Sequence, residues 1–145
     1  MHVHVHVHVH VHAHVTCNMR TAPILTVPMP PMVRRADQVQ VFDLDGVATR
    51  SFPARAEGAA AVLCRPHGLA RGPNGLVYVA DTGHHRVAAF SPDGTLSFAF
   101  GRAGAEPGAF DEPRGLAVAG GRVWVADMCN HRLQAFDLAG RQVRG

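Results

Sequence analysis

Residues 66–90 read PHGLARGPNGLVYVADTGHHRVAAF, and residues 113–136 read PRGLAVAGGRVWVADMCNHRLQAF. The opening prolines, Pro66 and Pro113, are 47 positions apart, and the closing Phe90 and Phe136 are 46 positions apart. An almost constant spacing over many matched positions predicts a tandem structural repeat. A partial copy lies upstream, because residues 38–46 (QVQVFDLDG) match residues 133–140 (LQAFDLAG), so the repeat begins in mid-unit near Ala36.

Each unit contains four short apolar runs separated by turn residues, which is typical of an antiparallel meander. Val, Tyr, Trp and Phe favour a pleated sheet, and the runs are too short for helices. In the first full unit we expect strands at 68–70, 76–80, 86–90 and 96–100, with Pro-containing turns at 72–75 and 91–94. Four-stranded units repeated every 40 to 50 residues predict an all-β fold built from β-propeller blades.

The motifs Pro-x-Gly-Leu-Ala, Val-x-Val-Ala-Asp and Asn-His-Arg-Leu-Gln-x-Phe, with the connector GRAGAEPGAFDEP (residues 101–113), resemble NHL repeats. The resemblance implies a partial propeller of about two and a half four-stranded blades over residues 36–145. We expect a half blade at 36–52, a full blade at 66–100 and a nearly full blade at 113–145. Since NHL propellers typically have six blades, we interpret the chain as a fragment of a longer protein, or as one of several chains that complete a ring.

Residues 1–35 differ from the repeats. Residues 2–15 alternate His with Val, apart from Ala13, and residues 16–35 contain four prolines. We interpret this region as a low-complexity tail and an extended linker, both disordered. The three cysteines show no paired spacing, so the sequence predicts neither a disulfide framework nor a zinc finger.

Composition narrows the possible partners. The chain has 145 residues, 47% of them hydrophobic, and a formal charge of +3. From Ala36 onward eleven arginines balance eleven acidic residues, so RNA is a weakly supported partner and protein is favoured. We expect no membrane partner and a cytoplasmic location, because no apolar run is long enough to span a bilayer and no signal peptide is recognisable.

Strand order predicts which loops lie together. In an up-and-down blade, the loop between the second and third strands and the connector to the next blade share one end. We therefore expect a partner-binding surface there, and family resemblance associates such surfaces with protein or RNA. The candidate residues are His84, His85, Arg86, Arg102, Arg114, Asn130, His131 and Arg132.

Asp81 and Asp127 close the second strand of each unit. Because both recur at the same repeat position, we assign them a structural role in the turn: each carboxylate is expected to accept backbone N–H bonds from the loop that follows, under the His and Arg side chains.

An enzymatic alternative rests on His67. The sequence Pro66-His67-Gly68-Leu69 is similar to a motif of peptidyl-hydroxyglycine amidating lyases, in which the histidine is a zinc ligand. Arg114 departs from that pattern in the second unit, and a catalytic zinc needs about three protein ligands. We therefore predict a non-catalytic interaction scaffold with no required cofactor, linked to ubiquitin pathways only through the family resemblance. Open blade edges also predict self-association.

The tail carries a prediction of its own. Its histidines occupy alternate positions, about 6.6 Å apart in an extended chain, so neighbouring neutral imidazoles can share an adventitious divalent metal ion. The residues concerned are His2, His4, His6, His8, His10, His12 and His14. The full chain should be retained on a Ni²⁺ column at pH 7.5 and released at acid pH, where protons displace the metal. A chain starting at Thr16 should pass through; equal retention of both would contradict the assignment.

Overall fold

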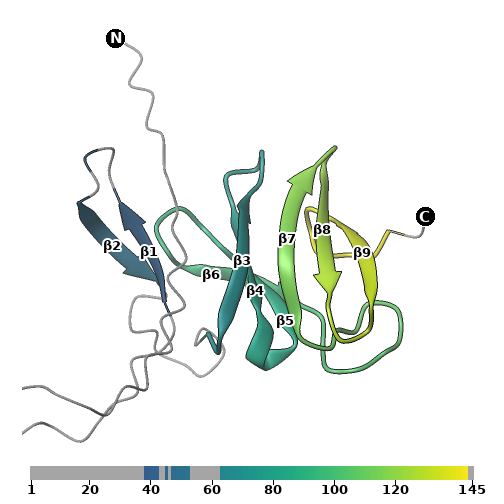
Figure 1. The fold of residues 1–145 in the computed structure, drawn as a ribbon. Coiled ribbons are helices and arrows are strands. Elements are labelled where there is room, and N and C mark those ends of the chain that lie inside the picture. The colour runs from purple at the N-terminus through teal and green to yellow at the C-terminus, as the bar shows by residue number, and fades with distance from the viewer. Residues whose placement is uncertain (1–37, 43–44, 46, 53–62, 144–145) are drawn as a thin grey trace, which may run out of the picture.

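The computed structural model describes residues 38–42, 45, 47–52 and 63–143, which form three antiparallel sheets standing side by side (Figure 1). The sheets have two, four and three strands, and within each sheet consecutive strands are neighbours. The all-β prediction is confirmed. The strands are β1 (Val39–Phe42), β2 (Ala48–Phe52), β3 (Pro66–Arg71), β4 (Val77–Asp81), β5 (Arg86–Phe90), β6 (Leu96–Phe100), β7 (Pro113–Ala119), β8 (Arg122–Asp127) and β9 (Arg132–Asp137).

The four-stranded sheet, β3 to β6, is the first blade. β5 and β6 coincide with the strands expected from the sequence, whereas β3 begins two residues earlier, at Pro66, because Pro66 pairs with Asp81 across a register irregularity. Both predicted turns are present: the N–H of Gly94 donates to the Ser91 carbonyl at 2.8 Å, and that of Gly75 to the Gly72 carbonyl at 3.0 Å.

The three-stranded sheet, β7 to β9, is the second blade. After β9 the chain turns back, and the N–H of Val143 donates to the Ala135 carbonyl at 2.8 Å. A bridge between Phe136 and Gln142 begins the fourth strand of this blade. β1 and β2 form the half blade predicted from the upstream partial repeat.

Alternation along the strands gives each blade two apolar faces. We call one the front face, which comprises Val77, Val79 and Phe90 in the first blade and Val123, Val125 and Phe136 in the second. We call the other the back face, which comprises Tyr78, Val87 and Ala89 in the first blade and Trp124, Leu133 and Ala135 in the second. The back face of the first blade packs on the front face of the second, and Phe110 completes this buried cluster.

The same arrangement occurs once more. Val39 and Val41 of the half blade are buried against the front face of the first blade. Polar bonds also cross the interface between the two larger sheets. The Tyr78 hydroxyl donates to the Leu138 carbonyl at 2.7 Å, and the Thr82 hydroxyl donates to the Pro113 carbonyl at 2.6 Å. Back-on-front stacking is therefore the rule by which the described sheets associate.

Residues 1–35, for which the sequence predicts a disordered tail and linker, lie outside the described residues. Within the described ranges, no helix is long and apolar enough to cross a membrane. A short 3-10 turn, η2 (Thr82–His84), joins β4 to β5.

Close approach of the innermost strands, β3 and β7, generates a testable prediction. A Cβ on Gly68 would lie 2.4 Å from the Arg114 carbonyl oxygen and 2.8 Å from the Leu116 nitrogen, both backbone atoms of β7. Gly68→Ala should therefore reduce the free energy of unfolding by about 1–3 kcal/mol in urea denaturation, because the strands must separate. Gly115→Ala, at the equivalent repeat position, should cost less, since its nearest contact is the Ala126 Cβ at 3.2 Å. Equal losses would refute this explanation.

Candidate functional site

The loop end of the blades comprises η2 with His85, residues 128–131 and the connector 101–112. In Figure 1 the β4–β5 and β8–β9 loops lie at the same end of their sheets, as strand order predicts. Direct contacts join the loops to the connector. The Asn130 side-chain amide donates to the Gly104 carbonyl at 2.9 Å, and the N–H of Cys129 donates to the Asp111 carbonyl at 3.0 Å.

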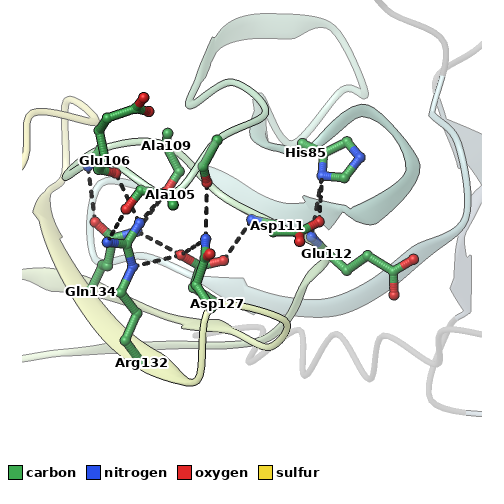
Figure 2. Close-up of polar contacts among 12 residues, drawn as sticks. His85, Ala105, Glu106, Ala109, Asp111, Glu112, Asp127, Arg132 and Gln134 are labelled. Carbon is green, nitrogen blue, oxygen red and sulfur yellow. Dashed lines mark hydrogen bonds and ion pairs between the residues drawn. The ribbon is translucent and has the colours of Figure 1, made fainter.

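The carboxylate of Asp127 is completely buried and organises the second blade's part of this end (Figure 2). Its Oδ1 accepts the backbone N–H of Asp111 at 2.7 Å. Its Oδ2 accepts from the Asn130 amide at 2.9 Å, the Arg132 Nε at 2.8 Å and the Gln134 amide at 3.1 Å. We call this arrangement the Asp127 hub; it offsets the cost of burying a charge with four donors, one of them cationic.

Asp81 forms an equivalent hub in the first blade and is also completely buried. Its Oδ1 accepts the backbone N–H of Cys64 at 2.7 Å, and its Oδ2 lies 2.9 Å from His84 Nδ1 and 2.7 Å from Arg86 Nε. Ala88 occupies the repeat position of Gln134, so this hub lacks an equivalent amide donor.

The backbone donors to Asp81 and Asp127 correct the sequence-based expectation. They come from Cys64 and Asp111, which lie 17 and 16 residues upstream, rather than from the loop that follows each aspartate. The predicted His contacts differ as well. His85 and His131 adopt the left-handed backbone conformation, with φ near +52° and +51°, and their N–H groups close the turns. Each hub therefore ties a loop to the start of its own blade.

Arg132, predicted to bind a partner, is fully engaged within the chain (Figure 2). Besides Asp127, its guanidinium donates to the carbonyls of Ala105 at 2.6 Å, Glu106 at 2.8 Å and Ala109 at 2.8 Å. These bonds fix the connector against the second blade. Of the other candidates, His84, Arg86 and Asn130 likewise point to a buried aspartate. Four of the eight predicted binding residues therefore bond to a hub aspartate and support the loop end from within.

The remaining candidates lie on the more exposed part of the loop end, which we call the rim. Arg102 pairs with Glu106 at 3.3 Å, with both side chains about two-thirds exposed. His131 is exposed and, in the part of the chain that the structure describes, its side chain has no hydrogen-bond partner. His67 is exposed on β3. The described residues include no group of three or more His, Cys, Asp or Glu side chains that could hold a metal.

Glu112 links the two blades at this rim. Its carboxylate lies 2.8 Å from Arg114 Nη2 and 3.4 Å from Arg65 Nη2, and its N–H donates to His85 Nδ1 at 3.2 Å. His85 Nδ1 also lies 3.5 Å from the Asp111 carboxylate. The hydrogen bond from Arg114, together with the charges of Arg114 and Arg65, lowers the pKa of Glu112 below its ordinary value.

Sequence reasoning missed Arg65. It immediately precedes Pro66, as Glu112 precedes Pro113, so the two residues occupy one repeat position with opposite charges. Both have positive φ, +48° and +51°. Opposite charges at one position of neighbouring repeats were the signal that would have predicted this inter-blade pair.

Cys129 is the exposed thiol of the loop end. Desolvation by surrounding groups, and then the negative charges of Asp111 and Glu112, raise the pKa of this thiol. Because the thiolate is the reactive form, these neighbours suppress its nucleophilicity at neutral pH.

Comparisons with known proteins agree with this architecture. The family model described as NHL repeat matches residues 63–90 and 110–136. NHL repeat-containing protein 2 from Bos taurus and from Homo sapiens are each 32% identical over 74 residues; the match spans 45% of this chain and 10% of the relative. A streptogramin B lyase structure and virginiamycin B lyase from Staphylococcus aureus each give a TM-score of 0.56 at 16% identity, over 74% of this chain and 33% of theirs. The predicted resemblance to NHL repeats is confirmed, and the structural likeness shows the fold.

The Asp127 hub predicts a large and specific loss of stability. Asp127→Ala should lower the free energy of unfolding by about 2–4 kcal/mol, because the donors of Asn130, Arg132 and Gln134 lose their acceptor. Glu106→Ala removes a carboxylate from the same end of the molecule but breaks an exposed pair, and should cost less than about 1 kcal/mol. Urea denaturation of both variants measures the contrast. Similar losses would mean that Asp127 does not organise the loop end.

Proposed function

Since the chain contains two NHL repeats, we propose that it serves as a non-catalytic module that binds another protein through the loop-end rim. The rim comprises Arg65, His67, Arg102, Arg114 and His131, with Glu106, Asp111 and Glu112 among them. The matched segment spans about one tenth of the length of these relatives.

The observation that carries the proposal is the contrast between hubs and rim. In the hubs each aspartate has several donors, whereas the Arg114 Nε is buried and, in the described part of the chain, has no hydrogen-bond partner. The cost of this unsatisfied donor is recovered only when binding moves the Arg114 side chain and gives Nε an acceptor, because the atom has almost no accessible surface here. The Arg114 side chain is 41% exposed, so a partner can reach it.

The charge of the rim favours protein over RNA. Arg65, Arg102 and Arg114 balance Glu106, Asp111 and Glu112, and the hub pairs Arg86–Asp81 and Arg132–Asp127 are also neutral. Nucleic-acid binding depends on an excess of cationic side chains facing phosphates. A surface that carries both charges suits a polypeptide partner. Such a partner supplies carboxylates or carbonyls as acceptors for the arginines, and donors for the acidic side chains. A link to ubiquitin pathways rests on family resemblance alone.

Peptide selection tests the proposal. A random peptide library displayed on phage is selected against the full chain, and the best peptide is measured by calorimetry. Arg114→Ala should weaken its binding about tenfold, the loss expected for a charge-assisted contact. Arg71→Ala provides the matched control, because Arg71 is an exposed arginine at the opposite end of β3. An equal loss for both variants, or selection of no peptide, would contradict the proposal.

The enzymatic alternative has its own measurement. A metal-dependent lyase would bind zinc through His67, so bound zinc is quantified in the full chain and in His67→Ala after dialysis at pH 7.5. A scaffold predicts the same zinc content in both, arising from the tail. Loss of one zinc per chain on His67→Ala would replace the scaffold with a metal site.

A further inference from the structure

The carboxylate of Glu112 is shared by two arginines, and it fills neither of them completely. Its Oε2 accepts from Arg114 Nη2 at 2.8 Å, and its Oε1 lies 3.4 Å from Arg65 Nη2. A guanidinium often holds a carboxylate through two parallel bonds, which are stronger than one. Glu112 offers each arginine a single oxygen, and Arg114 Nε, a second donor of the same guanidinium, has no hydrogen-bond partner among the described residues. The present pairing is therefore weaker than these arginines can make.

The backbone around Glu112 is fixed, whereas its carboxylate is accessible. The Glu112 N–H donates to His85 Nδ1 at 3.2 Å, and the carbonyl of the next residue, Pro113, accepts from the Thr82 hydroxyl at 2.6 Å. Figure 2 shows the Glu112 side chain extending away from the Asp127 hub. The side chain is 25% exposed, and rotation about its own bonds moves the carboxylate without moving the backbone. The carboxylate can therefore leave the arginines while the two blades stay joined.

The contacts of Glu112 also indicate what could replace it. The hydrogen bond from Arg114, with the charges of Arg114 and Arg65, lowers the pKa of Glu112, so the group held at neutral pH is a charged carboxylate. Pairs between partly exposed charges contribute little to stability, so separating them costs little. The carboxylate of Asp111, the neighbouring acidic residue, lies 3.5 Å from His85 Nδ1 and is engaged there. A second carboxylate that approaches from solvent therefore competes with Glu112 alone.

We infer that the rim recognises an acidic side chain, Asp or Glu, of its polypeptide partner, and that Glu112 occupies the same place until that side chain arrives. The inference rests on the proposed function and names the chemical group that the rim binds. The incoming carboxylate binds Arg65 and Arg114, and the Glu112 carboxylate turns into solvent. Because Arg114 Nε has almost no accessible surface, the guanidinium shifts as Glu112 leaves, and a two-bond contact then supplies the missing acceptor. Glu112 thereby excludes neutral ligands, which cannot displace a charged competitor.

The first test uses the peptide selected by phage display and a copy in which every Asp and Glu is replaced by Asn or Gln. Calorimetry with the full chain should show that the copy binds at least tenfold more weakly, because a neutral amide does not displace Glu112. Equal affinities, or a selected peptide that lacks an acidic residue, would overturn the inference and leave the proposed function in place. Selection of no peptide would remove both.

The second test removes the internal competitor. Glu112→Gln should bind the acidic peptide at least threefold more tightly than the unmodified chain, because the arginines no longer hold a charged group. A residue that only links the blades predicts the opposite sign, since its loss would loosen the rim and weaken binding. Unchanged or weaker binding by Glu112→Gln therefore overturns the inference.

Asp93→Asn is the matched control for Glu112→Gln. It removes the same charge from the β5–β6 turn, at the opposite end of the first blade, and keeps the side-chain oxygen that accepts the Thr95 N–H at 3.0 Å. Its affinity for the acidic peptide should change less than twofold, and equal gains for both variants would mean that net charge alone acts. A melting curve checks that both variants fold. If Glu112→Gln does not fold, the comparison of the two peptides on the unmodified chain still decides.

Discussion

The buried carboxylate of Asp127, at the end of the second strand of its blade (β8), is the constraint on which the rest of the loop end depends. Asp127 has no exposed surface, so its charge must be satisfied within the protein. The donors that satisfy it come from the connector, the β8–β9 loop and β9, which places these three segments against one another. Arg132 then extends the arrangement by holding three connector carbonyls. The Asp127 carboxylate thereby fixes the backbone of the connector and of the β8–β9 loop, which carry rim residues.

Differences between equivalent repeat positions are the features that the shared fold does not explain, since residues common to both blades are accounted for by the fold. Arg65 and Glu112 hold one position with opposite charges and meet across the blade interface. Tyr78 is buried by a following blade, whereas Trp124 at the same position lines an open groove. The hubs are common to both blades and support the fold. Among the described residues, the rim and the back face of the second blade are where the repeats diverge.

The sequence was sufficient to predict the repeat, the strands of the first blade and the end at which the loops gather. These features follow from local periodicity, turn residues and strand parity, each readable within one unit. The partners of Asp81 and Asp127 were predicted wrongly, because Cys64 and Asp111 lie just before the first strand of each blade and reach the aspartates only when that strand pairs with the second. The hydrogen bonds of Arg132 to connector carbonyls were also not predictable from the sequence, because they depend on the folded position of the connector. The contact between Gly68 and the β7 backbone had no local signal at all.

The short span of each hub affects how the chain acquires its structure. Cys64 and Asp81 are 17 residues apart, and Asp111 and Asp127 are 16 apart, so each hub closes a small loop with a modest entropic cost. Among the described residues, the donors to Asp81 are Cys64, His84 and Arg86, all upstream of the second blade. During synthesis, the first blade's hub can therefore form before β7 leaves the ribosome. The first blade then offers a finished back face on which the second can assemble, so the direction of translation matches the direction of stacking.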